Sequence, residues 1–422
     1  MENEFAKIAE QQRKYRTVQG IMKYVNEAAL MKQHRKQEKN KARGIDGVTK
    51  SEYAKGLNEN IKDLIGRMKT MSYRPQAVRR TYIPKTGSTE LRPLGIPAYE
   101  DKLVQGAMAE ILTAIYEPIF LDVSYGFRPN RDAHQAIKKL DEIIMKKKVN
   151  YVVDVDIKSF FDNVNHEWLI KFLEHTIEDP KFIRYVTRFL KAGVMENKQR
   201  HESDRGTPQG GSISPILSNV YLHYVLDLWF EQYIKIKSKG EAYMVRYADD
   251  YVCCFENKED AEMFYAELRE RLNKFDLKIA EDKSKIIPFG RNTESKETFE
   301  FLGFTHVNGK NRNEYYKLEH HTCMKKSRAK KQAIKEWIKE KARIYPIPYL
   351  IKKLNIKLQG MFRYYGISDN YRWMRNMVYY VKGELRKWLS RRSQKGKISW
   401  EKLNKILNYN PLVQPKIYHP LW

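Results

Sequence analysis

The spacing of apolar residues along the chain alternates between helical and strand periods. Residues 103–120, LVQGAMAEILTAIYEPIF, carry apolar side chains at helical spacing, which predicts a core helix. Residues 151–175, YVVDVDIKSFFDNVNHEWLIKFLEH, begin as a strand and continue as a helix, with Asn165 as the expected N-cap. Residues 243–255, YMVRYADDYVCCF, predict two strands joined by a tight turn.

Further segments complete the expected order of elements. Residues 72–97 predict two strands around a Gly-Ser turn, and residues 259–275 predict an amphipathic helix. Residues 277–287 and the FEFLGF segment at 299–304 are each expected to form a short strand. This order predicts an α+β domain with helices on one face of a small sheet.

The C-terminal quarter predicts helices with apolar stripes and basic surfaces. From Lys325 to Trp422 there are 25 Lys or Arg and 5 Asp or Glu, so this segment supplies +20 of the net charge of +27. Two sets of apolar residues recur at helical spacing. They are Leu354, Leu358, Met361, Phe362 and Tyr365, and then Met374, Met377, Val378, Val381, Leu385, Trp388 and Leu389.

The charge of the chain narrows the class of partner. The 79 basic residues outnumber the 52 acidic residues, which indicates a polyanionic partner such as nucleic acid. A membrane surface fits less well, because no run of 18 apolar residues occurs. Cys253, Cys254 and Cys323 have neither disulfide nor zinc spacing, so we expect buried thiols in a reducing compartment and a cytoplasmic protein.

Acidic residues interrupt two of the strand patterns. Asp154 and Asp156 are two apart and share one face of a strand, and Asp249-Asp250 stand at the expected hairpin turn. If these segments pair, their carboxylates repel each other unless a cation is bound, and Mg²⁺ suits such oxygen ligands. Each Asp by itself also fits ordinary turn chemistry, and Asp162 also fits a helix start.

The ordered set of motifs resembles reverse transcriptases encoded by bacterial group II introns. The motifs are IPKTGSTELRPLGIP at 83–97, YGFRPNRDAHQAI at 125–137, DIKSFFD at 156–162, RGTPQGGSISPILSN at 205–219, YADD at 247–250 and FLGF at 301–304. The segments LQGMFRYYGISDNY and PKIYHPLW resemble the thumb or maturase region of that family. No Cys pairs or His-rich nuclease motif follow the thumb, so an endonuclease is not expected.

The resemblance implies a right-hand polymerase with fingers, palm and a helical thumb. We expect an N-terminal extension of the fingers over 1–80, fingers and palm over 81–305, and a basic thumb or maturase domain over 306–422. The palm core is expected at about 150–170 and 230–305. Two Mg²⁺ ions, with Mn²⁺ as an alternative, would activate a primer 3′-hydroxyl and stabilise pyrophosphate.

The resemblance also implies roles for individual residues. The expected metal ligands and catalytic residues are Asp156, Asp249 and Asp250. The expected nucleotide-binding residues are Lys85, Arg92, Phe161, Gln209 and Lys283, where Lys283 is the general acid and Lys285 its competitor. The expected primer and template contacts are Arg128, Phe301, Leu302 and Gly303.

The resemblance implies an RNA-directed DNA polymerase that uses an RNA template, a DNA primer and dNTPs, and that also binds intron RNA to assist splicing and mobility. Two alternatives stay open on the residues. One is an RNA-binding maturase that keeps the polymerase fold as a scaffold. The other is a domesticated reverse transcriptase in phage defence or DNA repair with a dedicated non-coding RNA.

Overall fold

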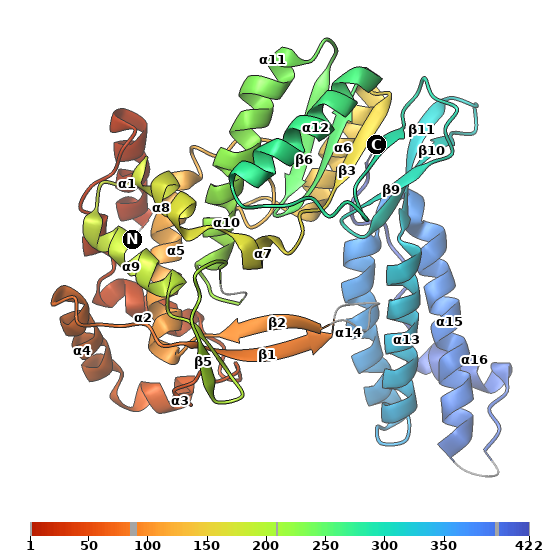
Figure 1. Ribbon diagram of the computed structural model, residues 1–422. Coiled ribbons are helices and arrows are strands. Elements are labelled where there is room, and N and C mark those ends of the chain that lie inside the picture. Colours follow the sequence, from red (N-terminus) through yellow and green to blue (C-terminus); the bar gives the residue numbers. More distant parts are fainter. Residues whose placement is uncertain (1, 85–90, 208–209, 393–395, 422) are drawn as a thin grey trace. The chain divides into compact units, whose positions relative to one another are not determined.

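The computed structural model describes residues 2–84, 91–207, 210–392 and 396–421 (Figure 1). The described chain divides into two compact units. Described residues within 1–136, together with 151–286, form the first unit, and residues 137–150 and 287–421 form the second. The domain boundaries expected at residues 80 and 305 stay predictions. The two compact units meet along the chain after Ala136, after Asn150 and after Ile286.

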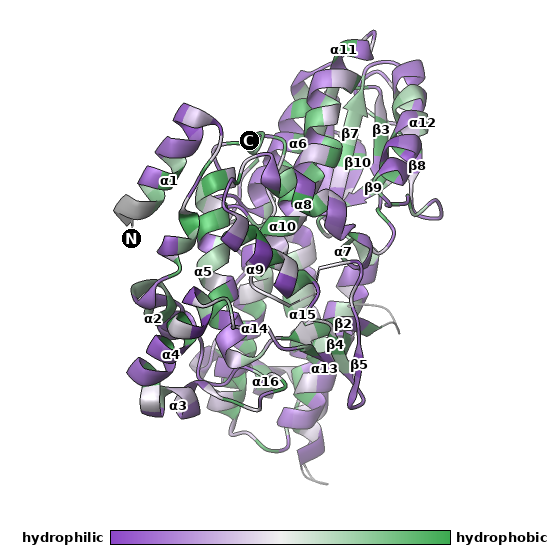
Figure 2. Cartoon of the chain, turned by 60° about the vertical axis from the view of Figure 1, so that its left-hand side comes forward, coloured by the Kyte–Doolittle hydropathy of each residue, from purple (hydrophilic) through white to green (hydrophobic). Residues whose placement is uncertain are grey.

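The N-terminal helices belong to the first unit and share its core. Two of them begin with a side-chain cap: Asn26 accepts from the backbone of Ala29, and Thr49 forms a reciprocal capping box with Glu52. Their apolar faces join one core cluster with buried residues of the segments 151–155, 242–247 and 250–255. In Figure 2, α5 carries mostly hydrophobic residues, whereas α3 is mostly hydrophilic. The helices are α1 (Glu2–Tyr15), α2 (Glu27–Lys36), α3 (Lys50–Tyr53), α4 (Leu57–Lys69) and α5 (Tyr99–Tyr116).

The two strands expected on either side of the Gly-Ser segment are confirmed. Strands β1 (Val78–Pro84) and β2 (Leu91–Ile96) pair antiparallel, and Pro84 stands opposite Leu91 at the end of the ladder. The residues between them lie outside the described residues. The sheet continues through β4 (Val194–Glu196), which runs parallel to β1, and β5 (Gln199–His201).

A second sheet carries the acidic motifs. Its strands are β3 (Tyr151–Val155), β6 (Ala242–Tyr247), β7 (Asp250–Phe255) and β8 (Lys285–Pro288), in the order β6-β7-β3-β8. Helix α12 (Lys258–Lys274) packs on this sheet with the ring of Phe264 at 5.2 Å from that of Phe255. The other helices of the first unit are α7 (Phe160–Asn163), α8 (His166–Glu174), α9 (Pro180–Leu190), α10 (Ser214–Leu222) and α11 (Lys235–Lys237). Two π-helical turns, His223–Asp227 and Phe230–Ile234, separate the last two.

The second unit combines a three-stranded sheet with helices. The FEFLGF segment does not form one strand. Leu302 and Gly303, with φ of 51° and 80°, form a tight turn between β9 (Thr298–Phe301) and β10 (Phe304–Lys310). The two strands pair antiparallel with Phe301 opposite Phe304, so the connection between them has to be this short. The other elements are β11 (Tyr316–Thr322), α6 (Ala133–Lys146), which begins in the first unit, α13 (Met324–Lys341), α14 (Ile347–Tyr365), α15 (Tyr371–Leu389) and α16 (Trp400–Tyr409).

The apolar stripes predicted for the C-terminal helices are confirmed. All five stripe residues of α14 and all seven of α15 are buried. The three cysteines are free and buried. Within the described part of the chain, no helix combines the length and the apolar character needed to cross a membrane.

Candidate active site

The tight turn of the YADD motif consists of two residues. Tyr247 of β6 pairs with Asp250 of β7, which leaves only Ala248 and Asp249 in the turn. Ala248 has a φ of 59°, a left-handed conformation that is unfavourable for a residue with a side chain. Asp249 is therefore the only acidic residue of this turn. Asp250, which we expected beside it in the turn, is the first residue of β7.

The end of β3 brings a second carboxylate to the same edge of the sheet. Val155 pairs with Tyr251, and continuing this antiparallel register by one residue places Asp156 opposite Asp250. The backbone N–H of Asp156 donates to Ser284 Oγ at 3.2 Å, and its carbonyl accepts from Ala280 N–H at 2.8 Å. The backbone of Asp156 is thus held by a loop from elsewhere in the chain.

Electrostatic interactions at the turn link four of the predicted residues. Burial raises the pKa of the Asp249 carboxyl, and the negative charge of Asp156 raises it further. The charges of Arg92 and Arg246 act in the opposite direction on the same pKa. Lys283 Nζ lies 3.2 Å from Asp156 Oδ2 in a partly exposed ion pair. The fold therefore brings Asp249 into electrostatic range of Asp156 and Arg92, and Asp156 in turn pairs with Lys283.

The donor set at this edge suits a hard divalent cation. Among the described residues, no group of three or more His, Cys, Asp and Glu side chains is arranged to hold a metal ion by itself. Magnesium sites in phosphate-processing proteins commonly use one or two carboxylates, and waters and substrate phosphates supply the other ligands. The two carboxylates whose charges interact, Asp156 and Asp249, match that pattern.

Phe161 lines an open depression beside the first hairpin. Its ring packs edge-on against buried Phe160, with centroids 5.3 Å apart. The depression has a volume of about 340 Å³, and strands β1, β2 and β4 form part of its wall. The remaining lining residues are Val78, Arg80, Tyr82, Pro93, Gly95, Asp162, Val194, Ser203, Arg205, Gly206 and Thr207.

The RGTPQGG loop holds α7 in place. Thr207 N–H donates to the Phe161 carbonyl at 2.8 Å, and Gly206 N–H donates to the Val164 carbonyl at 2.8 Å. Gly206 has a φ of 83°, and a Cβ there would lie 2.8 Å from the Phe161 carbonyl oxygen, so only glycine fits. Two predicted nucleotide-binding residues, Lys85 and Gln209, lie outside the described residues.

Arg128 has an internal role in the structure, unlike the template contact that we expected. Its side chain is 2% exposed and is paired with Glu117 at 2.9 Å. Its guanidinium also donates to the carbonyls of Leu121 and Ser124 at 2.7 and 2.9 Å. A buried cation needs such partners, and these bonds fix the loop that precedes YGFRPN. We therefore do not propose Arg128 as a template ligand.

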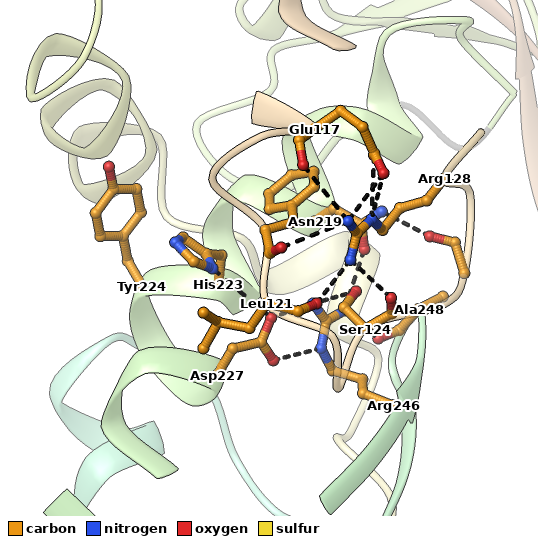
Figure 3. A network of polar contacts seen from close by, with 12 residues as sticks. Glu117, Leu121, Ser124, Arg128, Asn219, His223, Tyr224, Asp227, Arg246 and Ala248 are labelled. Atoms are coloured by element: carbon orange, nitrogen blue, oxygen red, sulfur yellow. Dashed lines mark hydrogen bonds and ion pairs between the residues drawn. The ribbon is translucent and has the colours of Figure 1, made fainter. Parts of the chain in front are cut away.

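The residues that hold the YADD turn from behind were not predicted from the sequence. Figure 3 shows Arg246, in the strand just before the turn, at the centre of a buried network. Its guanidinium donates to the Ala248 carbonyl at 2.8 Å, to Asn219 Oδ1 at 3.1 Å and to Ser124 Oγ at 2.8 Å. Both oxygens of Asp227, which is fully buried, accept from it at 2.6 and 2.5 Å. An arginine close before the acidic residues of the YADD motif was the available signal, but only the fold reveals its partners.

A glycine also supports the turn. A Cβ on Gly126 would lie 2.3 Å from the backbone nitrogen of Ala248, so the YGF segment packs directly against the YADD turn. Asn219 Nδ2 donates to the Gly126 carbonyl at 2.7 Å. Two motifs far apart in the sequence thus form one rigid support.

The predicted primer-contact residues lie in the second unit. Phe301 is buried, and Leu302 and Gly303 form the turn between β9 and β10. The Leu302 carbonyl accepts from Tyr364 Oη at 2.8 Å, and the Gly303 carbonyl accepts from Cys323 N–H at 3.1 Å. Their role in primer binding stays a prediction.

Comparison with known proteins gives two family matches along the chain. Residues 83–306 match the family described as reverse transcriptase (RNA-dependent DNA polymerase), and residues 327–406 match the group II intron maturase-specific domain. The chain is 45% identical over 185 residues to the group II intron-encoded protein LtrA of Lactococcus lactis subsp. cremoris, which covers 44% of this chain and 30% of LtrA.

A second relative is covered more fully. Protein YkfC of Escherichia coli (strain K12) is 32% identical over 273 residues, which is 58% of this chain and 71% of YkfC. The chain thus spans about a third of LtrA and more than two thirds of YkfC. Reverse transcriptases generally use divalent metal ions. The reverse transcriptase match covers more than half of this chain, and the maturase-specific match follows it along the sequence. The chain therefore belongs to the reverse transcriptases of the group II intron type.

Proposed function

We propose that this chain is an RNA-directed DNA polymerase that adds dNTPs to the 3′-hydroxyl of a primer on an RNA template. The observation that carries the proposal is that Asp156 and Asp249 lie at one sheet edge, where the charges of Asp156 and Arg92 both act on the Asp249 carboxyl. Carboxylates for metal and a cation for a triphosphate are the two requirements of nucleotidyl transfer.

Each residue of the site has a distinct task. Asp156 and Asp249 would hold Mg²⁺, with Asp250 beside them, and the metal supplies activation of the hydroxyl and stabilisation of the departing pyrophosphate. Arg92 and Lys85 would hold the triphosphate. Phe161 would lie under the sugar, where its ring disfavours a 2′-hydroxyl. Lys283, now paired with Asp156, would give a proton to the pyrophosphate.

The test is primer extension with an RNA template, a DNA primer, dNTPs and Mg²⁺. Asp249→Ala should lower the extension rate by at least about a hundredfold, since even indirect support of a metal ligand is worth 10- to 100-fold. Circular dichroism should be unchanged, because a residue at a turn is replaced. Full activity of this variant would contradict the metal assignment.

A second function is favoured by the maturase-specific match and by the basic C-terminal segment. We propose that the chain also binds structured RNA and assists splicing of an intron. Splicing that persists in Asp249→Ala would establish that the two functions are separable. Sequencing of the RNA that copurifies with the protein would distinguish an intron from a dedicated non-coding RNA of a defence or repair system.

A further inference from the structure

The outer face of α15 carries a basic surface that the polymerase site does not use. Four cations lie within about 60° of Tyr379 around the helix axis, at 3.6 residues per turn. They are Arg372, Arg375, Lys382 and Arg386. The single carboxylate of this fully described helix, Glu384, lies outside that arc and accepts a bond from the Trp388 indole at 2.9 Å. This face therefore attracts phosphate groups.

Aromatic rings occupy the middle of the same face. The rings of Tyr379 and Trp400 stack with centroids 6.1 Å apart and an interplanar angle of 16°. The guanidinium of Arg386 lies 4.6 Å from the Trp400 centroid. Tyr379 is 70% exposed and Trp400 is 37% exposed, so free ring area remains in water. Exposed rings next to arginines are the platform on which proteins stack unpaired bases.

Gly383 leaves the helix backbone on this face open to the close approach of a ligand. It lies inside α15, one turn after Tyr379 and one turn before Arg386. A Cβ at this position would meet nothing within 4 Å in the described chain. Glycine is a poor residue inside a helix, and no packing against the described residues requires it at this position. Close approach of an external group to the helix backbone would explain it.

We propose that Tyr379, Gly383, Arg386 and Trp400 form a binding site for an unpaired nucleotide of RNA. The base stacks on Tyr379, and the flanking phosphates contact the surrounding arginines and Lys382. Double-stranded RNA offers no free base face to such a ring. An acidic protein segment would use the cations but would have no need of the rings. This inference deepens the RNA binding of the proposed function and does not require polymerase activity.

The test measures RNA binding by fluorescence anisotropy with the full chain. A labelled single strand of about 12 nucleotides is compared with an RNA duplex of the same length, without dNTPs and with unlabelled primer–template in excess to occupy the polymerase site. Tyr379→Leu should weaken binding of the single strand at least about fivefold and leave duplex binding within about twofold. Tyr409→Leu is the matched control, since Tyr409 is 87% exposed on α16 away from the stack.

Gly383→Ala tests the site with a substitution that favours the helix and meets no clash within the described chain. It should raise the thermal midpoint, because alanine favours the helix, and it should still weaken binding of the single strand. Equal binding by Tyr379→Leu and Tyr409→Leu would overturn the proposal, as would an equal loss for single strand and duplex. If wild-type protein extends no primer but the Tyr379→Leu effect persists, the proposed polymerase function fails and this inference stands.

Discussion

At the scale of the residue, Asp249 is the most constrained group of the candidate site. Its carboxyl lies in a half-buried turn and interacts with the negative charge of Asp156. Burial and this charge both disfavour the ionised form of Asp249. The conformation of Ala248 adds local strain. Protein interiors tolerate such a combination mainly at functional sites, where a cation compensates it.

This constraint predicts an opposite effect of Asp249→Asn on stability and on activity. The pKa of Asp249 is raised in the fold, so its contribution to stability is present at low pH and is lost as the pH rises through the raised pKa. Without metal at neutral pH, the neutral Asn should therefore raise the thermal midpoint, while primer extension is lost. An unchanged or lowered midpoint, measured by calorimetry in EDTA, would contradict the burial of this charge.

Two variants distinguish whether Lys283 or Lys285 acts as the general acid. Lys283→Gln should lower the maximal extension rate by about 10²- to 10⁴-fold if it supplies a proton. The unfolding free energy should change by at most about 1 kcal/mol, because the ion pair with Asp156 is partly exposed. Lys285→Gln is the matched control and should retain activity. The reverse result would assign the general acid to Lys285.

At the scale of the element, the β6–β7 hairpin depends on a support built from other segments. Gly126 touches the backbone of Ala248, and Arg246 binds the Ala248 carbonyl from within the sheet. Asp227, which balances the charge of Arg246, lies at the end of a π-helical turn. Irregular turns of this kind commonly occur next to functional sites.

This support predicts that Gly126→Ala displaces the turn. The added methyl group has no room beside Ala248, so we expect a loss of about 1–3 kcal/mol of stability and a marked drop in extension rate. Gly66→Ala is the control, because a Cβ there meets nothing within 4 Å and should stabilise α4 by about 1 kcal/mol. Denaturant unfolding and primer extension measure both variants. Wild-type activity in Gly126→Ala would contradict the supporting role.

The sequence predicted elements correctly where an apolar pattern extended over several helical turns or where a capping residue acted on its near neighbours. The stripes of α14 and α15 and the Asn165 cap, which accepts from Trp168 N–H, follow directly from spacing and side-chain chemistry. FEFLGF was misassigned because its apolar residues fit a strand. The turn at Leu302 and Gly303 arises from the pairing of β9 with β10, which no local pattern encodes.

At the scale of the whole molecule, charge dominates the expected behaviour. The net charge of +27 predicts that binding of RNA or DNA weakens steeply with salt, because phosphate neutralisation releases counterions. A plot of log affinity against log salt for a primer–template duplex should be linear with a slope of several units. Asp249→Ala should keep this slope, since it removes no cation. A flat salt dependence would contradict binding through the phosphate backbone.

The sequence alone determined the class of this protein. The resemblance of its ordered motifs to a known family implied the polymerase type, and its excess of basic residues indicated a nucleic-acid partner. Its periodicities and turn chemistry identified the hairpins and the acidic candidates, because these depend on neighbours in the chain. Only the tertiary structure decided which candidates meet. It joined Asp249 to Asp156, turned Arg128 inward, and placed Arg246, Asp227 and Gly126 behind the turn. Burial and electrostatic coupling arise between segments far apart in sequence, so no local pattern contains them.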